Sequence, residues 1–373
     1  MSTVADYKLF TPLVLGKGLT LKNRIVMAPM GRARGDIDKR EPLARNEIYY
    51  AQRATAGLIV TEATPISEQG FAWYGSPAMY TDAHAAAWKK VVDRVHVEGG
   101  KIFMQIWHMG RQAHSSFNAK KEVVAPSAIP MPEGRLRDCN GEYVLPEVPR
   151  ALETHEIPEI VDDFRKGAAL AKKAGFDGVE IHAANGFLID GFLQSTTNHR
   201  ADQYGGSIEN RSRFLLEVVE AVKREWPSDR IGVRVSPNGV FGCMGSPDNY
   251  DQFTYTAAQL NKHNLAYIAV LDGPGFGHHD KGRLVTAFDI KRFFTGNVFV
   301  TTGYTRDIAE GALRSGAADA VCFGRPFISN PDLVARFRND WPLAPTAPYD
   351  EWWQPEKGAE GYTTYPAYAH EEQ

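Results

Sequence analysis

The sequence predicts a closed (β/α)₈ barrel, and two observations support this prediction. Eight short apolar or β-branched runs recur along the chain, and amphipathic helical stretches lie between them. The runs are continuously apolar rather than alternating, which is typical of strands that are covered on both faces in a parallel sheet. The strand candidates span residues 24–30, 58–63, 101–107, 177–182, 230–236, 266–271, 297–302 and 319–323.

The helical patterns complete the alternation. Pro331 is expected to open a last helix, because proline is favoured in the first helical turn. An α/β fold follows, and closure into a barrel is our first interpretation. An open doubly wound sheet is the alternative, but the chain has neither a GxGxxG fingerprint nor a GxxxxGK[ST] loop. The predicted helices span residues 45–56, 85–98, 157–174, 208–226, 250–264, 307–315 and 332–338.

Length and composition place limits on the class of protein. The chain of 373 residues has the length of one large barrel, so we expect a single domain over residues 1–373 with its core at about 9–366. The net charge of −3 gives no reason to expect a nucleic-acid partner. No apolar run reaches the length of a membrane span, and the N-terminal stretch does not resemble a signal peptide. A monomer and a homodimer both remain open.

The cysteines indicate the redox setting. Cys139, Cys243 and Cys322 are an odd and sparse set without CxxC spacing. This pattern argues against a disulfide framework and against a structural zinc site. A reduced, cytoplasmic setting fits it best.

Two long loops follow strand candidates. Residues 118–156 are rich in proline and charge, and residues 273–284 (GPGFGHHDKGRL) come directly after the sixth candidate. The loops at the carboxyl ends of barrel strands form the active sites of such folds. We therefore expect both segments to lie near a site.

The residues at the carboxyl ends of the strand candidates are polar and aromatic, with few carboxylates. No tight cluster of His, Asp and Glu occurs among them, which argues against a metal site and against a glycosidase with two carboxylates. Amides, aromatic rings and arginines suit an organic cofactor that supplies the difficult chemistry. In chain order the set is Ala28, Pro29, Met30, Gly31, Glu62, Ala63, Thr64, Gln105, Trp107, His108, His182, Asn185, Phe187, Arg234, Gly303, Gly324 and Arg325.

The last two strand ends predict a phosphate site. Gly303 and Gly324 allow close approach of the backbone, and Arg325 supplies a fork of donors. Barrels often bind phosphate after their seventh and eighth strands. Each glycine alone would more simply form a tight turn, but the combination with Arg325 favours phosphate.

Several motifs resemble the old yellow enzyme family of FMN-dependent NAD(P)H ene-reductases, including its 12-oxophytodienoate reductase-like members. They extend from about Leu9 to Tyr365, which is essentially the whole chain. The stretch from His182 to Arg211 is the most specific part. The motifs are NRIVMAPM at 23–30, QIWHMGR at 105–111, EIHAANGFL at 180–188, DQYGGSIENR at 202–211, GRPFISNPDL at 324–333 and GYTTYP at 361–366.

The resemblance implies an activity and a cofactor. FMN is bound without a covalent link at the barrel mouth, and NADPH or NADH reduces it. Hydride then passes from flavin N5 to the β-carbon of an activated alkene such as an enone, enal, quinone or nitroalkene. His182 and Asn185 are implied to hydrogen-bond the substrate oxygen and to stabilise the charge that develops on it.

The resemblance also implies which residues hold the flavin. Gln105 contacts the pyrimidine ring, and Arg234 lies near N1 and O2, where the reduced flavin gathers charge. Without the resemblance, Gln105 could be a buried amide, Arg234 could pair with a structural carboxylate, and Asn185 could cap a helix. The implied cofactor-binding set is Ala28, Pro29, Met30, Gly31, Ala63, Gln105, Arg234, Gly303, Tyr304, Gly324 and Arg325.

The pocket aromatics are implied less sharply. Trp107 and Phe241 are expected to line the pocket. Two short stretches, 67–77 and 354–360, appear longer than the family pattern, so the neighbouring aromatic positions stay open. The candidates are Phe71, Trp73 or Tyr74 in one place and Trp352 or Trp353 in the other.

Two positions depart from the family pattern. Phe187 stands where the family usually has the tyrosine that protonates the α-carbon after hydride transfer, and phenylalanine has no proton to give. Water, Tyr74 or Tyr365 could supply the proton, the reaction could be a redox-neutral alkene isomerisation, or the substrate could need no donor. Gly31 stands where a threonine hydroxyl can bond flavin O4.

Three functions therefore compete. The first is an ene-reductase with slowed protonation, which we favour, and the second is a flavin-dependent alkene isomerase. A non-catalytic flavin-binding sensor is the third, but it would not need the oxygen clamp of His182 and Asn185. Lys281 and Arg283 are possible contacts for the 2′-phosphate of NADPH, or solvated surface charges.

Overall fold

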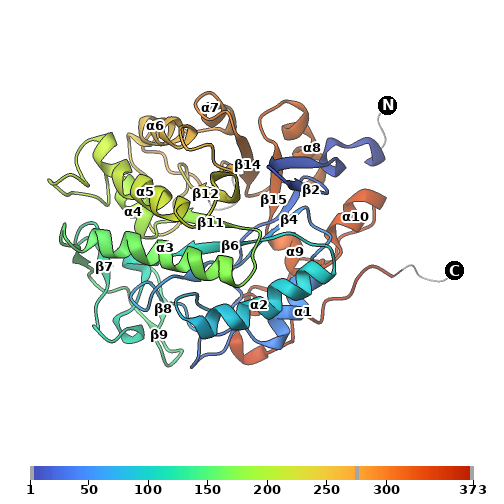
Figure 1. Cartoon of the computed structure of the whole chain (residues 1–373), viewed down its shortest axis with the longest axis horizontal. Coiled ribbons are helices and arrows are strands. Elements are labelled where there is room, and N and C mark those ends of the chain that lie inside the picture. The colour runs from blue at the N-terminus through green and yellow to red at the C-terminus, as the bar shows by residue number, and fades with distance from the viewer. Residues whose placement is uncertain (1–3, 274–276, 370–373) are drawn as a thin grey trace.

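Eight parallel strands close into a barrel in the computed structural model, which describes residues 4–273 and 277–369 (Figure 1). Neighbouring strands pair in register around the ring, and pairing of β15 with β3 and of β11 with β6 closes it. All eight predicted strands are confirmed, and closure excludes the open sheet. The strands are β3 (Ile25–Met27), β4 (Leu58–Val60), β6 (Ile102–Trp107), β11 (Gly178–Ala183), β12 (Ile231–Val235), β13 (Tyr267–Leu271), β14 (Asn297–Thr301) and β15 (Ala320–Phe323), and the short β5 (Thr64–Pro65) also pairs with β6.

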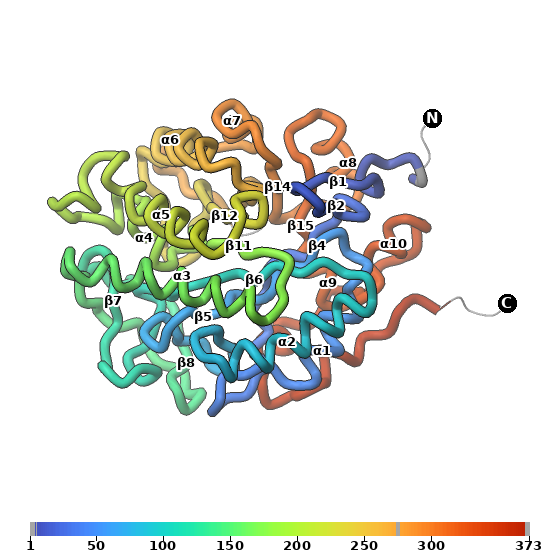
Figure 2. Tube along the Cα trace, viewed as in Figure 1, coloured from blue at the N-terminus to red at the C-terminus, as the bar shows by residue number. Residues whose placement is uncertain are grey.

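Helices surround the strands, with α5 and α6 on the opposite side of the barrel from α1 and α2 (Figures 1 and 2). The seven predicted helices are present with ends shifted by a few residues, and three short ones were not predicted, namely α4, α7 and α9. The helices are α1 (Ala44–Ala51), α2 (Asp82–Val97), α3 (Ile157–Lys173), α4 (Leu188–Leu193), α5 (Ile208–Lys223), α6 (Asn249–Asn261), α7 (Ala287–Lys291), α8 (Arg306–Arg314), α9 (Arg325–Ser329) and α10 (Leu333–Asn339).

The expectation that Pro331 opens the last helix is wrong. Asp332 is the N-cap of α10, so Pro331 lies before the helix rather than in its first turn. A proline does occupy the first turn of the short α9, which begins at Arg325. Single 3₁₀ turns supply the remaining helical pieces, at η1 (Val4–Asp6), η2 (Lys8–Phe10), η3 (Gly110–Gln112), η4 (Ser115–Phe117), η5 (Ser228–Arg230), η7 (Tyr349–Glu351) and η8 (Pro355–Lys357).

A hairpin that was not predicted closes the amino-terminal end of the barrel. Its strands are β1 (Leu13–Gly16) and β2 (Leu19–Leu21), which pair antiparallel. The leucines of both strands alternate with exposed residues and belong to the same buried cluster as the barrel interior. With this end closed, the carboxyl ends of the strands form the open mouth.

The long segment 118–156 is ordered by two small strand pairs. β7 (Val124–Ala125) pairs in parallel with β10 (Arg150–Ala151), and β8 (Leu136–Arg137) forms a hairpin with β9 (Tyr143–Val144). Arg150 adds ion pairs to Glu122 and Glu156 at 2.8 and 2.7 Å.

Stacked aromatic rings fill the barrel interior. The ring of Tyr267 lies 4.1 Å from that of Phe299 and 6.1 Å from that of Phe103, centroid to centroid. This stack requires Gly232 on the adjacent strand, because a Cβ there would lie 2.3 Å from the Tyr267 ring.

Replacement of Gly232 by alanine is therefore expected to destabilise the fold by about 1–3 kcal/mol through overpacking. Gly311 in α8 is the matched control, since a Cβ there meets nothing within 4 Å. Gly311→Ala is expected to stabilise the protein by about 0.5–1 kcal/mol, because alanine favours the helix. Urea unfolding of both variants measures the difference, and equal stabilities would contradict this account of the core.

Candidate active site

A cavity of about 450 Å³ occupies the carboxyl-terminal mouth of the barrel. Each strand end that was predicted to contribute to the site supplies at least one residue to the wall of this cavity. The predicted residues that line it are Ala28, Pro29, Met30, Gly31, Ala63, Trp73, Gln105, Trp107, His182, Asn185, Phe187, Arg234, Phe241, Gly303, Tyr304, Gly324, Arg325, Trp352 and Trp353.

Some lining residues were missed. Thr301, Thr302 and Cys322 lie at the ends of the two strands that lead into the predicted phosphate site. Their positions in the sequence could therefore have predicted that they line the cavity. Ser76 and Thr346 come from irregular segments, where the sequence pattern gives no periodicity to follow. Phe323, Pro326 and Ile328 complete the set.

Five predicted strand-end or pocket residues do not line the cavity, namely Glu62, Thr64, His108, Phe71 and Tyr74. His108 is buried with its Nδ1 accepting the Gly110 N–H at 3.1 Å, and burial lowers its pKa to about 3. Phe71 packs against Phe117 in a separate cluster, at 5.4 Å between ring centroids. Tyr74 lies under the guanidinium of Arg137. Trp73 is therefore the aromatic of its stretch that lines the cavity, whereas Trp352 and Trp353 both do.

A buried carboxylate organises the polar wall of the cavity. Glu180 accepts hydrogen bonds from Gln105 Nε2 at 2.7 Å and from the Tyr267 hydroxyl at 2.8 Å. Burial raises the pKa of Glu180, and the charge of Arg234 opposes this rise. Because the Gln105 amide nitrogen donates to Glu180, the amide oxygen of Gln105 is the atom that can accept a hydrogen bond from a ligand.

Several buried polar atoms on this wall have no partner among the described residues. They are Nε and Nη1 of Arg234, Nδ1 of His182 and Nε1 of Trp107, and all three side chains line the cavity. No ion pair joins Arg234 to a carboxylate in the described part of the chain, so the structural-pair alternative for this residue is not supported. Unpaired buried donors are costly, and their concentration here indicates a site for a polar ligand.

His182 sits in an aromatic corner. Its ring lies 4.9 Å from Phe187 and 6.3 Å from Trp107, and these two rings meet edge to face at 4.7 Å. Burial, with a contribution from Arg234, holds the pKa of His182 well below its usual value. The imidazole is therefore neutral at physiological pH and donates a single N–H.

The loop after β11 holds Asn185 in an uncommon conformation. Asn185 and Gly186 both have positive φ, at 59° and 71°. The Asn185 N–H donates to Ser236 Oγ at 2.7 Å, and its carbonyl accepts from Gln112 Nε2 at 2.6 Å. Phe187, not Asn185, is the N-cap of α4, so the helix-cap alternative for Asn185 does not hold.

The opposite part of the cavity contains the predicted phosphate site. Gly303 follows Thr302, and both have positive φ, at 87° and 77°. Arg325 begins α9 and lies 5.2 Å from the Trp352 ring. The Tyr304 hydroxyl donates to the Asp272 carboxylate at 3.1 Å, and burial raises the pKa of Asp272 to about 6.

Buried arginines hold the C-terminal segment against the mouth. Arg32 donates to the carbonyl oxygens of Trp352 at 3.1 Å and Gly361 at 2.8 Å, and to the Tyr49 hydroxyl at 3.1 Å. The Tyr49 ring stacks on Tyr362 at 4.0 Å. These contacts position the two tryptophans of the cavity wall.

The loop after the sixth strand contributes no described lining residue. Lys281 donates to the Gly245 carbonyl at 2.9 Å, and Arg283 pairs with Asp289 at 3.0 Å over the ring of Tyr250. Residues 274–276 of this predicted loop lie outside the described residues.

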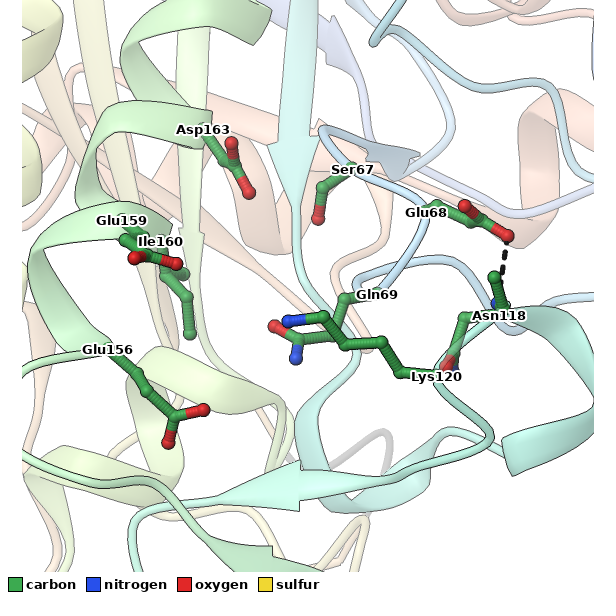
Figure 3. Close-up of a pocket in the computed structure, with 10 residues that line it drawn as sticks. Ser67, Glu68, Gln69, Asn118, Lys120, Glu156, Glu159, Ile160 and Asp163 are labelled. Carbon is green, nitrogen blue, oxygen red and sulfur yellow. Dashed lines mark hydrogen bonds between the residues drawn. The ribbon is translucent and has the colours of Figure 1, made fainter.

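A second cavity, of about 210 Å³, shares no lining residue with the first. In Figure 3, Glu156, Glu159 and Asp163 lie on the α3 side of it and Lys120 lies opposite. Within residues 4–273 and 277–369, no group of His, Cys, Asp and Glu is arranged to hold a metal ion. None of the helices in that part of the chain combines the length and hydropathy needed to cross a bilayer.

Comparisons with known proteins agree on one family. The model of the NADH:flavin oxidoreductase / NADH oxidase family matches residues 8–343. A putative 12-oxophytodienoate reductase-like protein 1 of Arabidopsis thaliana is 39% identical over 340 residues, which are 88% of this chain and 99% of its own. The 12-oxophytodienoate reductase 1 of Oryza sativa subsp. japonica is 37% identical over 370 residues, which are 98% and 94% of the two chains.

Solved structures resemble the whole barrel. Morphinone reductase in complex with tetrahydroNAD has a TM-score of 0.89 at 41% identity, covering 98% of this chain and 99% of its own. The old yellow enzyme homologue from Zymomonas mobilis has a TM-score of 0.91 at 41% identity, covering 97% and 100%.

Removal of the guanidinium in Arg32→Met is expected to destabilise the protein by about 3 kcal/mol, because it leaves buried carbonyl groups without donors. Cleavage by a protease within 350–361 should become faster as the segment detaches. Arg94→Met is the matched control, because Arg94 forms an exposed pair with Glu98 and its loss should cost less than about 0.5 kcal/mol. Thermal melting and timed proteolysis measure both, and an Arg32→Met protein as resistant as the control would contradict this role.

Proposed function

The chain belongs to the NADH:flavin oxidoreductase / NADH oxidase family, as an FMN-dependent NAD(P)H oxidoreductase of the old yellow enzyme type, and from this premise we propose that it reduces activated alkenes. The substrates proposed are enones, enals, quinones and nitroalkenes. One observation carries the proposal. The neutral imidazole of His182 and the amide of Asn185 line the same cavity as the buried cation Arg234.

The lining residues fit FMN. Arg234, with its unpaired donors and positive charge, would hold the flavin pyrimidine edge together with the Gln105 amide. Gly303, Tyr304, Gly324 and Arg325 would hold the phosphate. FMN, when bound, supplies the acceptance and delivery of hydride. Ala28, Pro29, Met30, Gly31 and Ala63 would complete the flavin contacts.

His182 and Asn185 would hold the substrate by its carbonyl or nitro oxygen. Each donates one hydrogen bond to this oxygen, and both bonds strengthen as negative charge develops there. Because His182 is neutral and buried, it polarises the substrate without transferring a proton. Trp107, Trp73, Phe241, Trp352 and Trp353 would exclude water from the rest of the pocket.

The proton that the α-carbon needs after hydride transfer would come from solvent. Neither Tyr74 nor Tyr365 lines the cavity, and the Tyr365 hydroxyl donates to Glu351. The hydroxyl of Tyr304 donates to Asp272. With Phe187 in the donor position, protonation is slow, and alkene isomerisation is the second candidate function because a longer-lived carbanion permits bond rotation.

The finer properties follow the same reasoning. Both NADH and NADPH are proposed as hydride donors, because Lys281 and Arg283 are engaged elsewhere and give no preference. A single domain is proposed because one buried cluster extends from Leu9 to Tyr362. Three free cysteines suit a reduced, cytoplasmic setting. A monomer or a homodimer is proposed. No nucleic-acid or membrane partner is proposed.

The proposed function is tested by colour and by product. The purified protein should be yellow or should bind added FMN. Oxidation of NADPH or NADH in the presence of an acyclic enone of defined E or Z geometry, with analysis of the product, then separates reduction from isomerisation. Recovery of isomerised alkene with no net consumption of nicotinamide would favour the second candidate.

Phe187→Tyr is expected to raise the rate of enone reduction by about 10²-fold, because it restores a general acid at the donor position. Reduction of the enzyme by NADPH in the absence of enone should change little. Stopped-flow measurement of each half-reaction separates the two effects. An unchanged rate of enone reduction in a folded, FMN-loaded variant would show that Phe187 does not occupy the donor position.

Gly31→Thr is expected to raise the flavin midpoint potential by roughly 20 mV, the equivalent of one hydrogen bond of about 1 kcal/mol for a two-electron couple. The pocket has room for the side chain, because the nearest atom to a Cβ on Gly31 is Trp353 Nε1 at 3.9 Å. Gly31→Val is the control of similar shape without a hydroxyl. A redox titration in which both variants have the same potential would contradict the prediction.

A further inference from the structure

A buried carboxylate lies beneath the loop that carries Asn185. Asp190, in α4, is 0% exposed and accepts the Gly186 N–H at 2.8 Å. It also accepts from the Ser236 hydroxyl at 3.3 Å and from Gln194 Nε2 at 3.0 Å. All three of these partners are donors, which is the arrangement that suits the ionised form of the carboxylate.

Asp190 reaches Asn185 through two routes. Ser236 Oγ accepts the Asn185 N–H at 2.7 Å while its own hydrogen points to Asp190. Gly186, the next residue, donates directly to Asp190. Both residues of this turn have positive φ, which is uncommon for residues other than glycine, although asparagine adopts it more readily than most.

Asp190 also reaches the wall that carries Phe241. Gln194 donates to Asp190 and accepts the Gly245 N–H at 2.8 Å through its own oxygen. Arg111 supports the same loop by donating to the Gly242 carbonyl at 2.7 Å. The segment 241–245 is therefore tied to the same carboxylate as the Asn185 turn.

We propose that Asp190 is a positioning residue whose ionised carboxylate holds both Asn185 and the Phe241 loop in the geometry that binds a substrate oxygen. This inference rests on the proposed function, because Asn185 matters only if the cavity binds an oxygen-bearing substrate. Asp190 does not line the cavity and acts through the two segments.

Protonation of Asp190 would disturb the network. Burial raises the pKa of Asp190 to about 6, against the opposing effects of its donors Gly186, Gln194 and Ser236 and of the charge on Arg111. A carboxyl hydrogen would need an acceptor among neighbours that now donate to this group, so the bond with the Ser236 hydroxyl must reverse or another bond must break. Arg111 is the one charged side chain among these neighbours, and its guanidinium stays protonated near pH 6.

Protonation of Asp190 affects the stability of the fold in the opposite direction from its effect on ligand binding. Folding raises the pKa of Asp190 above its unfolded value of about 4, so the folded state binds this proton more tightly. Protonation of Asp190 therefore stabilises the fold as the pH falls from about 6 to about 4. Ligand binding lost in that range is not explained by unfolding that Asp190 causes, and the melting temperature at each pH checks this.

The test uses the FMN-loaded protein and cyclohexanone, a ketone that does not ionise and has no C=C bond to accept hydride from the flavin. The Kd is measured from the change in flavin absorption between pH 5 and pH 8. In the wild type the Kd should rise about ten-fold as the pH falls through about 6, the scale of one lost hydrogen bond to a buried charge. Asp190→Asn should bind weakly at every pH, with FMN affinity unchanged.

Two further variants sharpen the test. Ser236→Ala removes the hydroxyl that accepts the Asn185 N–H and donates to Asp190, but it keeps the bonds from Gly186 and Gln194 to Asp190. It should weaken cyclohexanone binding while the FMN affinity stays unchanged. Asp272→Asn is the matched control, because the pKa of Asp272 is also raised to about 6 and its partner Tyr304 lines the cavity. The step in Kd should persist in Asp272→Asn and disappear in Asp190→Asn.

The possible failures are distinguishable. A protein that does not bind added FMN overturns the proposed function and the positioning role with it. A protein that binds FMN but whose Kd for cyclohexanone is independent of pH overturns the positioning role alone. The positioning role alone is also overturned if Asp190→Asn binds cyclohexanone with wild-type affinity at pH 8. It is likewise overturned if Asp272→Asn abolishes the step in Kd.

Discussion

The buried carboxylate of Glu180 connects the barrel core to the cavity. One oxygen accepts from Tyr267, whose ring belongs to the stack inside the barrel, and the other accepts from Gln105 on the cavity wall. Arg234 supplies the charge that offsets the burial of this carboxylate. The packing of the core and the orientation of the polar wall therefore depend on each other, because a shift in either moves the hydrogen bonds of Glu180.

The eight strands were predictable because each is a continuous apolar run, and the strand ends followed from the fold. Gln105, His182 and Arg234 lie together for that reason. The hairpin of β1 and β2 was missed because its strands have four and three residues, too few for a reliable period. Distinguishing Trp73 from Phe71 needed tertiary packing, since both are aromatic residues in the same irregular stretch.

Hydrogen-bond networks were beyond the reach of the sequence for a different reason. Asp190 is one acidic residue in a short helix, and nothing in its local pattern marks it as a buried acceptor. Its partners Ser236 and Gly186 come from different strand ends and meet it only in the closed barrel. A motif can predict which residues carry the chemistry, whereas the groups that hold them follow from contacts between distant segments.

The C-terminal segment gives the cavity an order of assembly. Trp352 and Trp353 line the mouth but follow the last barrel strand, and Arg32 near the other end of the chain anchors them. Residues up to Trp353 must therefore leave the ribosome before the mouth has its final wall. This late segment is a wall of the cavity that evolution can change while the barrel stays as it is.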